Sequence, residues 1–327
     1  MSKILQAGWF PVLGVVLLWS LSERSASAQA NPEGIPYLRL AEPKRILDQA
    51  QAWEGDQQPH TLSVVELNRG GFRYWGYYGL NEGRGTGLAF SQDLVHWTKY
   101  AKNPLWKNAR WTSVLSGADP RHPGRLHYAI TRNYDTPQSH IVLASSDDGI
   151  HLKELKVLVK PKPAPRNRNQ NPNLFRDPVS KQFVLTYYSG NDDNHFDVVA
   201  RSATRIGDLA AAPERILLHE TTILAAPTML HLKPGPGSAQ GGYYLATEIC
   251  PQVGPKPTDV EWQVKVFHSE RLEGPYRPVS NNPVQTADRA CLFQHSFQGR
   301  YFGFQSHRLQ TNPIDVWEME VIEAPLP

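Results

Sequence analysis

The chain has 327 residues and a formal net charge of +3, with 34 Lys and Arg against 31 Asp and Glu. This near balance gives no electrostatic argument for a nucleic-acid partner or an anionic lipid surface, and we expect neither. Aromatic residues are frequent, with 9 Trp and 13 Tyr, and Gly and Pro are spread along the chain, as a fold with many turns requires.

The first 30 residues have the features of a cleaved export signal. Lys3 gives a positive start, an apolar stretch runs over residues 10–21, and small residues end at Ala28-Gln29-Ala30. The apolar stretch is too short to span a bilayer comfortably, which takes about 20 residues, and the A-x-A ending is typical of signal cleavage. We therefore predict a signal at residues 1–30, a single domain at residues 31–327, a secreted or periplasmic location, and no membrane contact after cleavage.

Beyond the signal, one element recurs five times: an apolar strand, a tight turn and an aromatic-rich strand. In chain order the strand pairs are Leu62–Leu67 with Phe72–Tyr78, Ser113–Ser116 with Arg125–Thr131, Asn173–Phe175 with Phe183–Tyr188, Thr228–Leu232 with Tyr243–Thr247, and Cys291–Phe297 with Arg300–Gln305. The turns end at Gly71, Gly124, Lys181, Gly242 and Gly299, at intervals of 53 to 61 residues. Such a fixed period is the signature of a repeat architecture.

A third strand follows each pair in the first four units, and most units add a fourth. The third strands are Leu88–Ser91, Ile141–Ser146, Val198–Ser202 and Val264–Ser269, and Lys156–Val159 and Arg215–Leu218 are examples of the fourth. Up to four antiparallel strands in each of five units, with no convincing helix between them, predict an all-β five-bladed propeller. The last unit lacks an outer strand, which we expect the segment Tyr37–Leu47 to supply, closing the ring.

The chain contains two cysteines, Cys250 and Cys291. In an exported protein they could form a disulfide, and two buried, reduced thiols fit the sequence equally well. Neither has the close partner spacing of a metal site. We expect no metal and no cofactor.

At this point the sequence resembles a known group. Phe72–Tyr78 and Gly87–Trp97 are similar to the first blade of glycoside hydrolase family 43 and its five-bladed relatives, which include invertase/levansucrase-type and neoagarobiose-hydrolase-type enzymes. Phe183–Ser189, Gly242–Thr247 and Glu273–Tyr276 match later blades, so the resemblance covers about residues 56–323. It implies a five-bladed propeller that hydrolyses glycosidic bonds of a carbohydrate in a central pocket. The Ser91–Trp97 element within it is a turn and packing motif, which supports the fold rather than the activity.

The family pattern also implies three inward carboxylates, and this sequence departs from all three. A catalytic base or nucleophile, an Asp that orients the substrate, and a Glu acid are expected at the openings of inner strands. Those openings hold His60, Asn171 and Ala225 instead. No catalytic residue is therefore carried over by motif.

The resemblance implies a pocket on the face where the inner strands begin. Asp119 and Asp177, each followed by Pro, fall in turns on the opposite face and are expected to be structural. On the pocket face, Glu248, Asp288 and Asp56 are our candidate catalytic carboxyls. Glycoside hydrolysis needs two carboxyls about 5–10 Å apart in opposite protonation roles.

The residues next to two of these acids suggest which of them would be ionised and which protonated. Arg289, adjacent to Asp288, is expected to hold Asp288 ionised as base or nucleophile. Glu248 ends an aromatic strand, and aromatic cover would keep it protonated as the acid. The alternative is that each acid forms a salt bridge with a loop.

Other side chains on this face suit sugar hydroxyls or sugar rings. The candidate substrate-binding residues are His60, Trp111, Arg132, Asn171, Asn173, Tyr188, Arg289 and His307. Asn and Arg offer planar hydrogen bonding, Trp111 offers a stacking surface, and His60 could bind a hydroxyl or act as an acid/base. A buried structural His and a Trp packed between blades are the alternatives.

The leading functional prediction is a glycosidase acting on a poly- or oligosaccharide. The missing carboxylates also allow a non-catalytic carbohydrate-binding propeller. A sialidase-like enzyme is suggested by Ser145–Leu152, although five repeats count against it, and a phosphorolytic variant would use Arg289 and His307 for phosphate.

Overall fold

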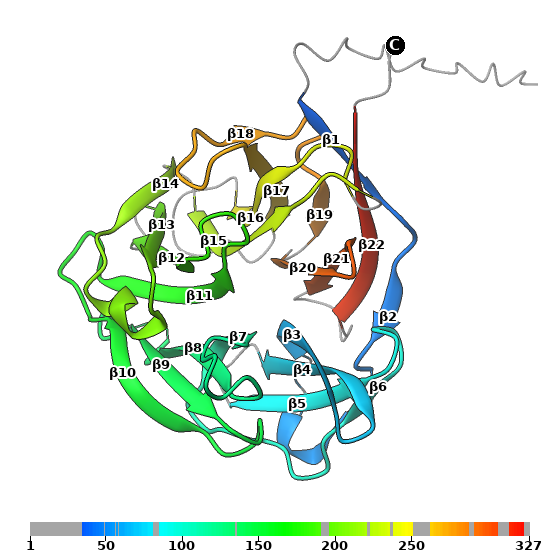
Figure 1. Ribbon diagram of the computed structural model, residues 1–327, viewed down its shortest axis with the longest axis vertical. Helices are drawn as coiled ribbons and strands as arrows, with labels where there is room; N and C mark the ends of the chain where they lie inside the picture. Colours follow the sequence, from blue (N-terminus) through cyan, green and yellow to red (C-terminus); the bar gives the residue numbers. More distant parts are fainter. Residues whose placement is uncertain are drawn as a thin grey trace, which may run out of the picture.

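The computed structural model describes residues 35–323 except 49, 56, 58, 81–84, 135, 191–195, 221–222, 236–237, 251–261, 288–290 and 307–313. Its five antiparallel sheets form the blades of a ring (Figure 1), so the predicted five-bladed propeller is confirmed. No helix in the described part of the chain is long and apolar enough to cross a membrane. The export signal lies outside the described residues and stays a prediction.

Each blade starts with a strand at the centre of the ring, and the following strands move outward. Blade 1 consists of β3 (Pro59–Arg69), β4 (Phe72–Leu80), β5 (Thr86–Ser91) and β6 (Trp97–Lys99), and blade 2 of β7 (Arg110–Ser116), β8 (Leu126–Arg132), β9 (His140–Ser146) and β10 (Lys153–Val159). Blade 3 consists of β11 (Arg168–Arg176), β12 (Phe183–Gly190), β13 (Phe196–Ala203) and β14 (Arg215–Glu220), and blade 4 of β15 (Ile223–Leu232), β16 (Gly242–Cys250), β17 (Trp262–Ser269), β18 (Arg277–Pro278) and β19 (Gln285–Ala287). Blade 5 contains β20 (Cys291–Phe297), β21 (Arg300–Ser306) and β22 (Ile314–Glu323). Two short 3-10 helices, η1 (Ala52–Glu54) and η2 (Ile206–Ala210), lie between strands.

The N-terminal segment closes the ring. Strands β1 (Pro36–Leu40) and β2 (Lys44–Ile46) both pair antiparallel with β22, the last strand of the chain. In Figure 1 the two blue strands lie along the red β22. The expectation that the segment from Tyr37 to Leu47 completes blade 5 is confirmed.

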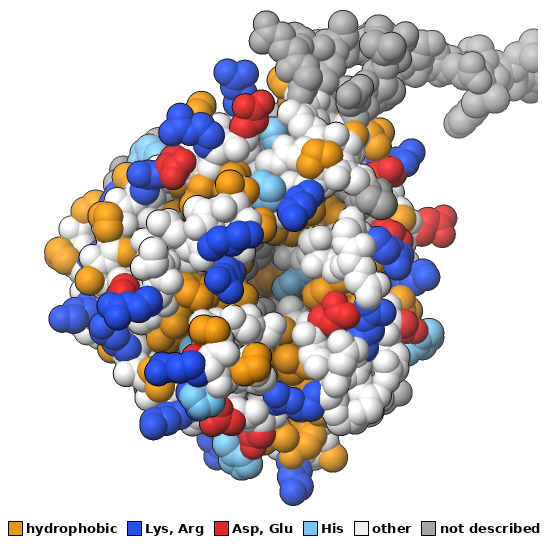
Figure 2. Space-filling view, in the orientation of Figure 1, with side chains coloured by type: hydrophobic (Ala, Val, Ile, Leu, Met, Phe, Trp, Pro, Cys, Tyr) orange, Lys and Arg blue, Asp and Glu red, His pale blue; other side chains and the backbone are white. Residues whose placement is uncertain are grey.

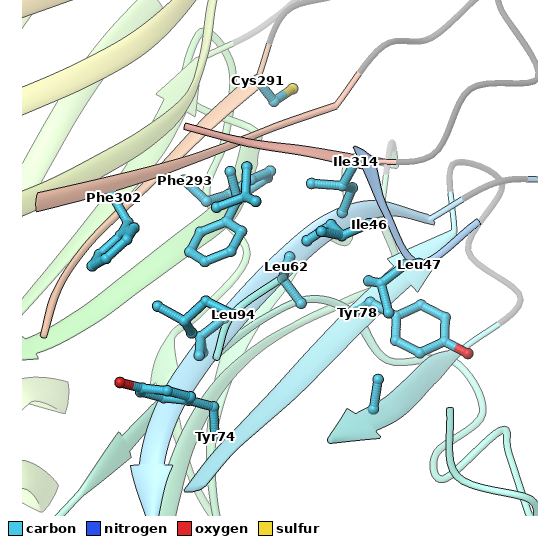
Figure 3. Packing of buried hydrophobic residues seen from close by; sticks show 14 of the residues in the cluster. Ile46, Leu47, Leu62, Tyr74, Tyr78, Leu94, Cys291, Phe293, Phe302 and Ile314 are labelled. Carbon is cyan, nitrogen blue, oxygen red and sulfur yellow. The ribbon is translucent and has the colours of Figure 1, made fainter. Parts of the chain in front are cut away.

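The apolar core is divided among the junctions between blades. Five clusters of buried residues each join strands of neighbouring blades. Figure 3 shows the junction of blades 5 and 1, where Ile46 and Leu47 pack with Leu62, Phe293 and Ile314. Burying such a side chain contributes roughly 1.5–3 kcal/mol, so the N-terminal segment stabilises the junction as well as the sheet.

Next to these cores, polar side chains tie each inner strand to the next. At every junction a side chain of one inner strand shares a hydrogen bond with the backbone of the next inner strand. The bonds join Ser63 Oγ to Val114 N (3.0 Å), Ser113 Oγ to Leu174 N (2.9 Å), Asn173 Oδ1 to Met229 N (2.8 Å), Thr228 Oγ1 to Leu292 O (2.8 Å) and His295 Nε2 to Val64 N (3.4 Å). The series runs once around the axis, and His295 closes it.

The Ser-x-Asp elements are turns, as predicted. Ser91 and Asp93 accept backbone N–H bonds from the residues that follow them, and Trp97 Nε1 bonds the Leu94 carbonyl. The copy at Ser146–His151 repeats these side-chain-to-backbone bonds. Burial raises the pKa of Asp93, but hydrogen bonds, first among them that of the His96 ring, outweigh it and lower this pKa to about 2.

His295 makes ring closure sensitive to acid. Its ring packs against Phe297 and Phe304, and burial lowers its pKa to about 4, although a bond with the Leu62 backbone acts the other way. Because the folded state favours neutral imidazole, its contribution to stability is complete above about pH 6.5, the ordinary His pKa, and is lost as the pH falls toward 4. The loss amounts to about 3 kcal/mol at most.

A His295→Gln variant tests this. Glutamine can still accept the Val64 N–H bond but does not titrate, so the variant should lose about 2 kcal/mol less stability than the wild type between pH 7 and pH 4. Urea unfolding at a series of pH values measures the difference. Parallel pH profiles for the two proteins would contradict the prediction.

Candidate functional site

The inner strands of four blades begin with a β-bulge on the same face of the ring. The register shifts lie between Pro59 and Thr61 in β3, Arg110 and Thr112 in β7, Gln170 and Asn173 in β11, and Ala225 and Thr228 in β15. The inserted residues are His60, Trp111, the pair Asn171-Pro172 and the pair Ala226-Pro227. Bulges re-aim side chains and are enriched beside active sites, and these occupy the strand openings that the family resemblance pointed to.

Three of the inserted residues adopt a left-handed backbone conformation. The φ angles are 53° for Trp111, 59° for Asn171 and 49° for Ala226. Such a conformation is unfavourable for most residues other than Gly, especially bulky ones, and clusters at functional sites. Trp111 and Asn171 also line a cavity of about 20 Å³ to which all five inner strands contribute. The strained backbone at Trp111 and Asn171 thus holds these two side chains at the axis.

At the same end of the ring, three blades bring a thiol, a carboxyl and an imidazole together. Cys291 Sγ, at the start of β20, donates a hydrogen bond to Glu248 Oε2 of β16 at 2.7 Å. His60 Nε2, in the bulge of β3, lies 3.8 Å from the same sulfur. All three side chains are buried. We call these residues the Glu248 cluster.

The Glu248 cluster adjoins Trp111, whose indole meets the His60 ring edge-on with centroids 5.7 Å apart. Trp111 also contacts Phe293 and stacks on Tyr134. Among the described residues no group of three His, Cys, Asp or Glu is arranged to hold a metal ion. The thiol, carboxyl and imidazole of the cluster can each take part in proton transfer and hydrogen bonding, and Trp111 forms an aromatic wall beside them.

Several buried polar atoms at this end of the ring have no hydrogen-bond partner within the part of the chain that is described. They are Trp111 Nε1, Asn171 Oδ1, Thr247 Oγ1, both amide atoms of Gln305, and Ser306 Oγ. Gln305 and Ser306 pair in register with Leu292 and Cys291, next to the Glu248 cluster. Buried polar groups in native proteins nearly always have partners. A polar ligand or bound water would provide them here.

The turn before the first bulge is anchored by a buried ion pair. The fully buried Glu54 accepts hydrogen bonds from Lys99 Nζ at 2.8 Å, Tyr78 Oη at 2.7 Å and the Gln51 N–H at 3.0 Å. Breaking such a pair by removing one partner typically costs about 3–5 kcal/mol. Glu54 thereby fixes the segment that leads into His60.

Two predicted sugar ligands, Arg132 and Asn173, are engaged in structural contacts. The Arg132 guanidinium bonds the Lys107 and Asn108 carbonyls and pairs with Glu154 on β10. Asn173 contributes one of the bonds between inner strands. These contacts favour structural roles for both, and their binding of sugar stays a prediction.

Tyr188 lies in the apolar cluster between blades 3 and 4 and is 4% exposed. The predicted residues Asp56, Asp288, Arg289 and His307 lie outside the described residues, so their roles also stay predictions. Asp119 and Asp177 accept backbone N–H bonds within their turns, as predicted.

Only some of the predicted site residues therefore lie close together in the structure. His60, Trp111, Asn171 and Glu248 come together at one end of the axis. Cys291, Gln305 and Ser306 were missed as site residues. One signal was available for the last two: they end an aromatic strand, just as Glu248 does.

Comparison with known proteins defines the fold further. No family model matches the chain, and no curated protein sequence does. A thermostable family-43 glycoside hydrolase matches its structure with a TM-score of 0.59 at 14% identity, covering 84% of this chain and 96% of the other. A family 117 glycoside hydrolase from the marine bacterium Zobellia galactanivorans matches with a TM-score of 0.55 at 10% identity, covering 89% and 92%.

A third similar structure is an N-acetylgalactosamine deacetylase from F. plautii, solved with blood group B trisaccharide. It has a TM-score of 0.56 at 12% identity and covers 87% of this chain and 94% of the other. At such low identities the likeness shows the fold. The chain has the five-bladed propeller fold of family 43 and family 117 glycoside hydrolases, as the sequence resemblance implied.

Proposed function

We propose that this chain is an exported enzyme that hydrolyses glycosidic bonds of a poly- or oligosaccharide, with its chemistry at the Glu248 cluster. The observation that carries the proposal is the coincidence of three features at one end of the axis. Strained bulges, a carboxyl bound to a thiol, and buried polar atoms that have no partner among the described residues all lie there. The similar structures, which include arabinanases, a galactanase and a family 117 glycoside hydrolase, support a carbohydrate substrate.

In this proposal Glu248 protonates the oxygen of the departing sugar. Trp111 stacks on a sugar ring, and His60 and Asn171 hydrogen-bond its hydroxyls. Asp288 is the proposed base or nucleophile. Only three peptide units separate Asp288 from Cys291, which limits their Cα separation to about 11 Å, and Cys291 touches Glu248. Paired carboxyls in glycosidases are about 5–10 Å apart, and this is the separation that the proposal requires of Asp288 and Glu248.

A carbohydrate-binding propeller without catalysis is the second candidate. It is favoured by the residues at the three strand openings: an imidazole at His60, a carboxamide at Asn171 and a methyl group at Ala225, in place of carboxylates. In that case the same aromatic and polar groups would bind sugar without cleaving it.

A substrate panel separates the two. The mature chain is incubated with arabinan, galactan, agar-derived oligosaccharides and aryl glycosides, with and without phosphate, and the products are analysed by chromatography. We expect release of a reducing sugar that does not depend on phosphate. Glycan binding without release would reject the hydrolase in favour of the binding protein, and release of a sugar 1-phosphate only with phosphate would identify a phosphorylase.

A further inference from the structure

The face of the ring opposite the bulges carries a second cavity, of about 600 Å³. All five inner strands line it where they end, and Gln294 and His295 are among its wall residues. Figure 2 shows one face of the ring, which is hollowed at its centre and has Lys and Arg side chains beside the hollow. The volume lies in the range of about 300–1,000 Å³ that is typical of small-molecule sites.

The charges that line this cavity are predominantly positive. Among its described lining residues the one carboxylate is Glu66, which is paired with Arg73 at 2.9 Å. Arg176 and Lys233 also line it, and both are exposed. The described part of the chain shows no ion pair for either; Arg176 makes only a long bond to the Lys181 carbonyl, at 3.4 Å, and lies over the Phe183 ring.

The wall of the cavity also contains an unsatisfied nitrogen. His231 Nδ1 is buried and has no hydrogen-bond partner among the described residues. Asp177, whose charge acts to raise the pKa of this ring, is occupied by the Ser180 N–H and hydroxyl and by Tyr243 Oη. Burial lowers the pKa of His231, so the ring that forms part of this wall favours its neutral form. Serine hydroxyls from Ser63, Ser113 and Ser116 complete the polar wall.

We propose that this cavity is a second ligand site, separate from the Glu248 cluster, for a sugar-sized molecule that carries a phosphate or carboxylate group. Arg176 and Lys233 bind the anionic group through charge-assisted hydrogen bonds. The serine hydroxyls bind the neutral part of the molecule. This proposal does not depend on the hydrolase activity proposed above.

Calorimetric titration of the mature chain at low salt tests the site. The probes are inorganic phosphate, glucose 6-phosphate, galacturonate and neutral glucose. We expect millimolar or tighter binding of at least one anion and no comparable binding of glucose. In an Arg176→Gln/Lys233→Gln double variant the affinity should fall about 10-fold or more. The matched control is Lys153→Gln, which removes an exposed cation of β10 outside the cavity, and it should bind as the wild type does.

Comparison of the four probes also identifies the class of ligand. Tighter binding of glucose 6-phosphate than of inorganic phosphate supports a sugar phosphate, and preference for galacturonate supports an acidic sugar. If inorganic phosphate binds as tightly as glucose 6-phosphate, the cavity binds a free anion and the proposal of a sugar-sized ligand is wrong. The proposal is overturned if no anion binds, if glucose binds as well as the anions, or if the double variant keeps its affinity.

Discussion

A chain that begins at residue 48 instead of residue 31 is expected either not to fold stably or to have a melting temperature at least 10 °C lower. Each kcal/mol of unfolding free energy lost lowers the melting temperature by about 2–4 °C in a protein of this size. The truncation removes β1 and β2, the two outer strands that pair with β22. It also removes Leu38 and Ile46, which are 2% and 1% exposed in the junction cores. Deleting such side chains costs roughly 2–5 kcal/mol each, against a total stability of about 5–15 kcal/mol for a typical domain.

Exposure of β22 adds a second cost. Its backbone groups would become an unpaired sheet edge, which promotes association with other chains. Thermal unfolding and size-exclusion chromatography of the truncated and full mature chains measure both effects.

Single substitutions provide the graded control for this truncation. Leu38→Ala and Ile46→Ala should each lower the unfolding free energy by about 2–4 kcal/mol. Leu155→Ala on β10 removes the same side chain as Leu38→Ala, but from a residue that is 47% exposed, and should cost less than about 0.5 kcal/mol. A truncated chain as stable as the full one would show that β22 needs no partner strands, and the ring-closure argument would fail.

The propeller was predictable because its evidence is local and repeated. Three of the five turns that were read from the sequence are short in the structure and contain a left-handed residue, with φ of 81° at Gly71, 64° at Lys181 and 77° at Gly299. The connections before β8 and β16, over residues 117–125 and 233–241, are longer than the tight turns predicted there. The inner strand of blade 3 was predicted only over Asn173–Phe175 but runs over Arg168–Arg176. The bulge at Asn171-Pro172 interrupts the alternation of polar and apolar residues, which is the signal that strand prediction uses.

The candidate site was less predictable because its residues are distant in the chain. Cys291 contacts Glu248, 43 residues away, and His60, 231 residues away. No spacing rule links residues from three blades. The sequence also left open whether the cysteines pair. Both are free and buried, and the Cys291 thiol has a carboxyl as its partner instead.

Replacement of Glu248 by Gln should reduce the proposed hydrolysis about 1,000-fold, within the usual range for loss of a general acid or base. The carboxamide has almost the same shape and keeps an oxygen that accepts the Cys291 bond, but it cannot transfer a proton. The melting temperature should therefore change little. The matched control is Glu270→Gln, an exposed glutamate just after β17 in the same blade, which should keep full activity.

Cys291 provides the finer test, because it acts through Glu248 as a positioning residue. Cys291→Ala removes the hydrogen bond to Oε2 and should lower kcat about 10-fold with little change in KM, since the carboxyl loses its fixed orientation. Cys291→Ser restores a donor and should recover most of the rate. Initial rates over a pH series, with melting curves for every variant, separate this role from a packing defect. Full activity in Glu248→Gln would reject the Glu248 cluster as the catalytic site. Equal losses of activity in Cys291→Ala and Cys291→Ser would show that the thiol matters for packing rather than for orienting the acid.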